Sequence, residues 1–325
     1  ASTDAELQEN LGTVEYNERI RQHYETFITE EDFRRMSSIG LNAVRIPVPW
    51  HVFGLQNDAA TYISAIDYID RAMEWGSKYN VSVLLDLATV PGGQGDSNEP
   101  QTTSRYIADW HSSTNGRHVA LEVLERLAAR YAVADALYGI ELLDSPVMSV
   151  RKNMFTMTDG IPGHYLRNFY RDAYDLLRKH MTNDKAVVFS ASGYPGLWKH
   201  FMRSSQYKNV MMDVHLYHYH DENAQDITSP RGLSAAIARN KAQIREAVGT
   251  GFPVIIGEWS AAAVMSSASV TPEGRSAYER VFVANQLASF SQAEGWFFQT
   301  WKTEKRIAAW DARLALGTLE RAMLD

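Results

Sequence analysis

A single glutamate stands where a short apolar run ends, and its position suggests nucleophilic chemistry. Glu258 lies in Gly257-Glu258-Trp259-Ser260, directly after the strand-like run Phe252-Pro253-Val254-Ile255-Ile256. Enzymes built on parallel α/β barrels keep their reactive side chains at such strand ends. A carboxylate there can attack an electrophilic carbon, but it needs a partner acid that protonates the leaving group. We therefore expect a second acidic residue at the end of an earlier strand.

The segment that should carry this partner reads Tyr138-Gly139-Ile140-Glu141-Leu142-Leu143-Asp144-Ser145-Pro146. It resembles the Gly-Ile-Glu-Leu-Leu-Asn-Glu-Pro segment of the fungal exo-β-1,3-glucanases of glycoside hydrolase family 5, and the resemblance covers nearly the whole chain. In that family the Glu before Pro is the general acid/base, whereas this chain has Ser145 there. Retaining glycosidases hold two carboxyl groups ~5–5.5 Å apart. The resemblance thus implies that the nucleophile Glu258 is kept and the other half of the catalytic pair is missing.

Other residues at predicted strand ends match the same family. The resemblance implies that Arg45 hydrogen-bonds the nucleophilic carboxylate and keeps it ionised. It implies that His215 and Tyr217 form the pair beside the nucleophile, and that Trp301 floors the subsite for the terminal sugar. Trp110 matches an aromatic residue at the mouth of the cleft. Core packing would explain each residue singly, but their order on successive strand ends makes the match specific.

Four positions depart from the family pattern and converge on the same site. Ala88 replaces a histidine, and Asp144 replaces the asparagine that holds the sugar 2-hydroxyl. Ser145 replaces the acid, and His220 takes the place of a phenylalanine that clamps the next sugar. Serine does not release a proton near neutral pH, and it is too short to reach the glycosidic oxygen. We therefore expect a pseudoenzyme that binds β-1,3-glucan with catalysis lost or strongly impaired.

The alternatives are an active exo-β-1,3-glucanase with a substitute acid, an interaction scaffold without a sugar ligand, and a metal-dependent hydrolase. Glu99, in a literal Asn98-Glu99-Pro100, is a poor substitute acid because it lies in a polar loop after the wrong strand. A metal site of His215, His218 and His220 is disfavoured because His215 would face away from the other two on a strand. The sequence has no Gly-x-Ser-x-Gly elbow and no phosphate-binding glycine loop, which argues against serine esterases and nucleotide sites.

Short apolar strands alternate with amphipathic helices, which predicts a parallel sheet with right-handed crossovers. A helix should begin at Thr29, where Asp32 forms a capping-box-like pair, and end before Gly40. The predicted strands are 43–47, 81–87, 138–143, 186–190, 210–215, 253–257 and 295–301. The predicted helices between them are 63–79, 116–131, 164–181, 233–249 and 273–294.

These elements favour an α/β fold of the (β/α)8 TIM-barrel type, with residues 1–325 forming a single domain. Only seven strands are recognisable. The family's first strand, with its Asn-Leu-Gly-Gly-Trp motif, should lie upstream of residue 1, unless residues 6–16 adopt an irregular structure in its place. Loss of a strand would open the barrel and expose two strand edges.

The composition of the chain excludes several classes of binding partner. The 325 residues are 45% hydrophobic and 22% charged, which is typical of a globular protein. The net charge of −7 argues against nucleic acid, and no apolar run approaches the roughly 20 residues of a membrane span. The absence of cysteine excludes disulfides and thiolate metal sites. We expect a monomer with no cofactor, no metal and β-glucan as its partner. The polar N-terminus is not a signal peptide, yet the resemblance implies a secreted or cell-wall-associated protein.

Overall fold

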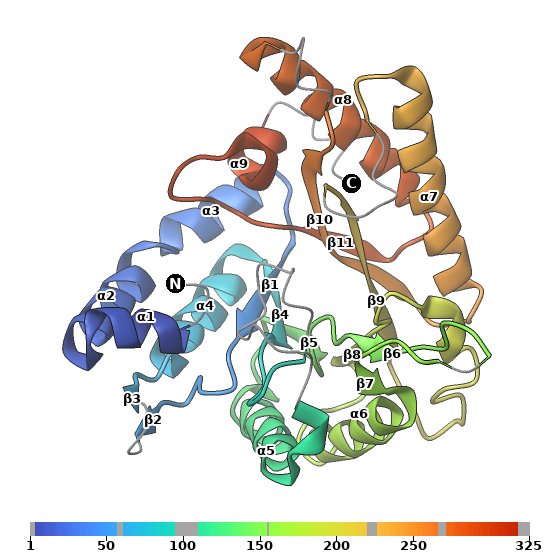
Figure 1. The fold of residues 1–325 in the computed structure, drawn as a ribbon. Helices are drawn as coiled ribbons and strands as arrows, with labels where there is room; N and C mark the ends of the chain where they lie inside the picture. Colours follow the sequence, from blue (N-terminus) through green and yellow to red (C-terminus); the bar gives the residue numbers. More distant parts are fainter. Residues whose placement is uncertain are drawn as a thin grey trace. The chain divides into compact units, whose positions relative to one another are not determined.

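From β1 (Ala43–Val48) onward, the long parallel strands of the chain alternate with helices (Figure 1). The structure is a computed structural model that describes residues 4–56, 61–94, 110–154, 156–219, 226–265 and 271–317. It comprises two compact units. The first is Ala1–Ser38, Asn42–Gly193 and Phe201–Val210, and the second is Ile39–Leu41, Tyr194–His200 and Met211–Asp325. The single domain over residues 1–325 stays a prediction.

The first unit is built on parallel strands in the order β1-β4-β5-β8. These are β1 (Ala43–Val48), β4 (Ser82–Leu87), β5 (Leu137–Glu141) and β8 (Ala186–Ser190). Every residue of β8 and all but one of β4 are buried, as expected for strands covered on both faces. The helices after the strands are α4 (Ile66–Tyr79), α5 (Thr114–Tyr131) and α6 (Gly163–Leu177). Smaller elements are the pairs β2 (Leu55–Gln56) with β3 (Thr61–Tyr62) and β6 (Met148–Ser149) with β7 (Ile161–Pro162), and η1 (Trp110–Ser112).

Three helices, not an irregular segment, precede β1. They are α1 (Asp4–Leu11), α2 (Thr13–Thr26) and α3 (Glu30–Ser38). Gly12 separates the first two with a φ of 79°, a left-handed conformation that glycine adopts without steric cost. No strand precedes β1 in residues 4–42, so the family's first strand is missing from this part of the described chain.

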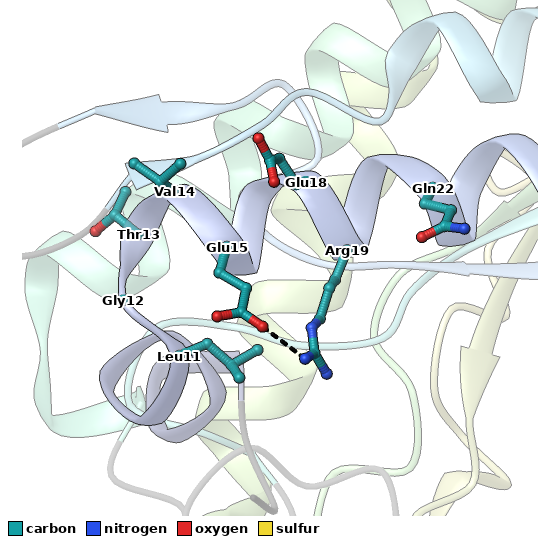
Figure 2. Close-up of a pocket in the computed structure, with 8 residues that line it drawn as sticks. All are labelled: Leu11, Gly12, Thr13, Val14, Glu15, Glu18, Arg19 and Gln22. Atoms are coloured by element: carbon teal, nitrogen blue, oxygen red, sulfur yellow. Dashed lines mark hydrogen bonds and ion pairs between the residues drawn. The ribbon is translucent and has the colours of Figure 1, made fainter.

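A pocket lies at the junction of α1 and α2 (Figure 2). Its walls come from these two helices and the residue between them: Leu11, Gly12, Thr13, Val14, Glu15, Glu18, Arg19 and Gln22. An exposed ion pair of 2.6 Å joins Glu15 and Arg19. None of these residues is aromatic, and none is a predicted site residue. Exposed pairs of this kind contribute little stability, and we assign the pocket no function.

The second unit contains parallel strands in the order β9-β10-β11. These are β9 (Val210–His218), β10 (Val254–Ala263) and β11 (Gly295–Phe298). The long helices α7 (Pro230–Val248) and α8 (Pro272–Ser289) alternate with them. Short helical segments are η2 (Pro195–Trp198), η3 (Ala308–Trp310) and α9 (Ala312–Ala315). Ile227, Ala236, Met265 and Phe282 form a small core around the two long helices.

Side-chain caps explain where several helices begin. The Asp32 carboxylate accepts a hydrogen bond of 2.9 Å from the Thr29 backbone N–H, so the predicted pair at the start of α3 is confirmed. Helices α5, α7 and α8 share another cap, in which a Ser or Thr hydroxyl accepts from the N–H of a glycine three residues later. The capping residues are Ser113, Ser229 and Thr271. Each cap satisfies an N–H that the first helical turn leaves without a partner.

All seven predicted strands are present among the described residues, and their ends differ by a few residues. Strand β8 has the predicted bounds, whereas β9 continues to His218 and β10 to Ala263. The strand predicted over 253–257 continues past Gly257, which forms a bulge inside the longer strand. The last strand ends at Phe298, before its predicted end at 301. No helix in the described part of the chain is long and apolar enough to cross a membrane.

Candidate active site

Arg45 holds three buried carboxylates together in the first unit. Its guanidinium lies 3.0 Å from Asp86, 3.1 Å from Glu141 and 2.9 Å from Asp144. Asp86 and Glu141 are opposite one another on β4 and β5, and Arg45 lies on the adjacent strand β1. The arginine and all three acids are nearly or fully inaccessible to solvent. Arg45 is the shared partner of the three acids, and removing one partner of such a buried ion cluster is strongly destabilising. Its predicted bond to the nucleophile stays a prediction.

Three of the four residues that depart from the family, Ala88, Asp144 and Ser145, follow the carboxyl ends of β4 and β5. The Asp144 N–H donates to the Leu87 carbonyl at 3.0 Å. The side-chain amide of Gln94 donates to the Ala88 carbonyl at 2.7 Å and to the Asp144 carbonyl at 3.3 Å. Ala88 and Asp144 are therefore tied to one another through backbone contacts. Their neighbour Ser145 is partly exposed and has a φ of 36°, in the left-handed region that non-glycine residues seldom adopt.

Glu258 is held by two side chains of β9 in the second unit. The Tyr217 hydroxyl donates to its carboxylate at 2.7 Å, and His215 Nδ1 lies 3.6 Å from the same oxygen. The Glu258 side chain is 9% exposed, so it is largely shielded from water. Hydrogen bonding to a carboxylate favours its ionised form. The structure thus brings the predicted Glu258, His215 and Tyr217 together.

A bulge at Gly257 aims Glu258 at His215. Ile256 is opposite Val214 on β9, yet Glu258 is opposite His215, so Gly257 is an extra residue in the ladder. Such a bulge redirects the side chains that follow it. Beneath it lies the fully buried Asp213, whose carboxylate approaches His215 Nε2 to 2.6 Å. A Cβ atom at position 257 would overlap that carboxylate.

Gly257→Ala is therefore expected to destabilise the protein, because the added methyl group must displace the buried Asp213 carboxylate. Forcing extra atoms into a packed interior costs about 1–3 kcal/mol. Urea unfolding measures the change. Gly295→Ala in β11 is the matched control, because a Cβ atom there meets nothing within 4 Å. Equal stability of the two variants would contradict the close approach of Asp213 to Gly257.

Gln299 also contacts Tyr217. The sequence did not predict this contact. The side-chain amide of Gln299 lies against the Tyr217 hydroxyl. That hydroxyl carries one proton and can donate it to one acceptor only. When it donates to Glu258, the Gln299 amide must turn its N–H group toward the tyrosine oxygen. A lone glutamine after a strand gives no sequence signal, so nothing could have identified this contact in advance.

The two predicted tryptophans are less accessible than sugar platforms. Trp110 is fully buried and packs edge to face on Phe169, with ring centroids 4.7 Å apart, and on Tyr165 at 5.3 Å. Trp301 is 8% exposed. An indole without an exposed face cannot stack on a ligand, and the placement of Trp110 therefore favours core packing, the alternative considered from the sequence. The subsite role of Trp301 stays a prediction.

His218 faces away from His215, as the strand periodicity predicts. It is buried, whereas His215 is partly exposed. Arg239 donates to its Nδ1 at 2.8 Å, and its Nε2 lies 2.8 Å from the Asn240 side-chain oxygen. A ring nitrogen that accepts from a guanidinium keeps its lone pair, so His218 is the neutral tautomer with the proton on Nε2. Its two nitrogens are thus committed to protein groups. His220 and Glu99 lie outside the described residues.

Asp311 fixes the loop that follows β11. Its carboxylate accepts from Arg313 at 2.9 and 2.6 Å and from the Thr303 N–H at 3.1 Å. Burial alone would raise the pKa of Asp311, but the hydrogen bonds from Arg313 and Thr303 and the charge of Arg313 outweigh it. The pKa is therefore lowered.

This shift predicts an acid-dependent loss of stability. Because the folded-state pKa of Asp311 is below its unfolded value, its contribution is complete above about pH 4 and is lost as the pH falls through the folded-state pKa. At pH 7 we expect Asp311→Asn to destabilise the protein by about 1.5–3 kcal/mol, and below pH 4 the difference should shrink. Unfolding curves of both proteins between pH 7 and pH 3 measure this. A difference that stays constant with pH would contradict the shift.

Known proteins are similar to this chain in sequence and in fold. The model of "Cellulase (glycosyl hydrolase family 5)" matches residues 8–297. A glucan 1,3-beta-glucosidase of Schwanniomyces occidentalis is 29% identical over 93% of this chain and 75% of its own length. A glucan 1,3-beta-glucosidase of Blumeria graminis is 30% identical over 90% of this chain and 73% of its own length.

Two solved structures share the fold at low sequence identity. A rutinosidase from Aspergillus niger has a TM-score of 0.74 at 19% identity and covers 95% of this chain and 84% of its own. The structure of AoRut has a TM-score of 0.78 at 18% identity, and the match covers 98% of this chain and 89% of the AoRut chain. Together with the family match, this likeness confirms the predicted TIM-barrel type of fold.

Proposed function

Because the chain belongs to glycosyl hydrolase family 5, we propose that it binds β-1,3-glucan and that hydrolysis is lost or strongly impaired. One observation carries the proposal. The position that should supply the general acid/base is Ser145, while the nucleophile position Glu258 keeps its contacts to Tyr217 and His215. Binding needs stacking and hydrogen bonds only, whereas cleavage of a natural sugar linkage also needs an acid for the departing oxygen.

The expected loss of rate is large. General acid–base catalysis contributes about 10²–10⁴-fold, and a serine hydroxyl does not supply it at neutral pH. The departing sugar would leave as an unprotonated alkoxide. By analogy with the family, we propose that the protein is secreted or associated with the cell wall. Binding to a polysaccharide without cutting it is compatible with that location.

An active glucanase with a substitute acid is the second candidate, because Asp144 places a carboxyl beside Ser145. Its contacts argue against this role. Asp144 is 4% exposed and its carboxylate pairs with Arg45 at 2.9 Å. An ion pair favours the ionised form of an acid, and an ionised carboxylate has no proton to give. A scaffold without a sugar ligand is the third candidate. It does not explain why Glu258 keeps its contacts to Tyr217 and His215.

Isothermal titration with laminari-oligosaccharides, with a hydrolysis assay on the same sample, separates the three candidates. Heat of binding without glucose release supports the proposal. Robust release of glucose from laminarin would show an active enzyme and refute it. No binding to any oligosaccharide would favour the scaffold.

A further inference from the structure

Trp310 lies at the end of the loop that follows β11, and the backbone holds it in place. The Thr300 N–H donates to the Trp310 carbonyl at 2.9 Å, and the Ala312 N–H donates to the Thr300 carbonyl at 2.9 Å. The next residue, Asp311, closes the loop through its bonds to Thr303 and Arg313. An indole on so constrained a loop is preorganised, which lowers the entropy cost of binding a ligand against it.

Trp310 belongs to an aromatic group beside Glu258. Its ring centroid is 4.9 Å from that of Tyr219, edge to face, and 5.8 Å from that of Tyr217 in a tilted arrangement. Tyr217 lies on β9 and faces the same side as His215, and Tyr219 follows the last residue of that strand. Because the Tyr217 hydroxyl also binds the Glu258 carboxylate, the group is continuous with the candidate nucleophile.

Each ring of this group is partly accessible to solvent, unlike the largest rings of the core. Trp310, Tyr217 and Tyr219 are all partly exposed, whereas the largest enclosed rings, Trp110, Trp198 and Trp259, are fully buried. Among the described residues, no group accepts a hydrogen bond from the Trp310 indole N–H. The side chain therefore offers both an apolar surface and a donor, a combination suited to a ligand with C–H faces and hydroxyl edges.

We propose that Trp310, with Tyr217 and Tyr219, is the aromatic wall against which a glucose ring binds next to Glu258. A β-linked glucopyranose has equatorial hydroxyl groups and axial C–H bonds, so its two faces are apolar and its edge is polar. It can rest its face on the aromatic rings, and a hydroxyl of the neighbouring glucose unit, beyond the ring edge, can accept from the in-plane indole N–H. This inference rests on the proposed function, and it assigns the main stacking role to Trp310 and not to the buried Trp301.

Titration calorimetry with laminaritriose tests the assignment. Trp310→Ala should weaken binding roughly tenfold to thirtyfold, as expected when a central tryptophan is removed from a binding surface. Trp310→Phe keeps a ring without the donor and should recover part of the affinity. Tyr278→Ala is the matched control, because Tyr278 is an exposed aromatic residue on α8 and should leave affinity unchanged.

The outcomes separate this inference from the proposed function. If the unaltered protein binds laminaritriose and folded Trp310→Ala binds equally well, the aromatic wall is wrong and the proposed function stands. If the unaltered protein binds no glucan, both the proposed function and the aromatic wall are wrong. Circular dichroism checks that each variant is folded. Should Trp310→Ala unfold, Tyr219→Ala tests the same wall, and unchanged affinity in that variant would overturn the proposal.

Discussion

A glucoside with a dinitrophenolate leaving group is expected to react with Glu258 although Ser145 supplies no acid. Dinitrophenolate leaves without protonation, so this substrate removes the need for the missing group. The contacts of Glu258 to Tyr217 and His215 favour an ionised carboxylate, which is the attacking form. We expect a burst of dinitrophenolate and a covalent glucosyl adduct at Glu258, detected by mass spectrometry of the intact protein.

Added azide should then speed turnover. The second step needs a base that activates water, and Ser145 provides none, whereas azide attacks as an anion without such help. The gain should approach the factor of about 10²–10⁴ that general acid–base catalysis supplies, and the product should be glucosyl azide. Glu258→Gln should abolish both adduct and azide effect. If the unaltered protein forms no adduct, the changes around Arg45 have disabled attack as well.

The sequence predicted the strands well because parallel strands covered on both faces are nearly continuous apolar runs. The match of β8 to its predicted bounds is the clearest case, since all its residues are buried. The same signal predicted Glu258 directly after a strand, whereas β10 continues beyond it to Ala263. The contact between Glu258 and Tyr217 depends on a bulge at Gly257, and a pattern of apolar residues has no signature for a one-residue shift between strands.

What the sequence missed lies where local patterns carry little information. Helices α1 and α2 have weak amphipathic patterns and are separated at Gly12, so the region looked irregular. Gln299 and Trp310 are brought to Tyr217 by a loop that the Thr300 and Asp311 hydrogen bonds close. Their contacts with Tyr217 join residues that are distant in the chain. Trp110 was assigned from its match to an aromatic residue of the family, and the local sequence does not show that its side chain is fully buried.

Restoring the acid alone is expected to fail. Ser145→Glu returns a carboxyl to the position of the acid, but it stands next to Asp144, which already shares Arg45 with Asp86 and Glu141. A fourth acid beside one guanidinium raises the electrostatic cost of keeping all of them ionised, and protons will be taken up to relieve it. The new glutamate would then lack the defined protonation state that an acid/base residue needs.

Ser145→Glu combined with Asp144→Asn and Ala88→His should behave differently. Asp144→Asn removes one negative charge from the Arg45 cluster and returns an amide donor for a sugar 2-hydroxyl. Ala88→His returns an imidazole to the end of β4, where Gln94 already links positions 88 and 144 through their backbone carbonyls. Because the three groups would act as one unit, we expect the triple variant to hydrolyse laminarin faster than the sum of the single variants.

The triple variant should gain up to about 10²–10⁴-fold in laminarin hydrolysis over the unaltered protein, measured as glucose released. Addition of Glu258→Gln must remove the gain, since the nucleophile would be gone.

Ser145→Gly is the matched control at the same position. Glycine accepts the φ of 36° more readily than serine, so this variant should fold well and stay inactive. A triple variant that folds and binds glucan yet releases no glucose would show that the loss of activity extends beyond positions 88, 144 and 145. Position 220, where His220 replaces the family's phenylalanine, would then be the next position to restore.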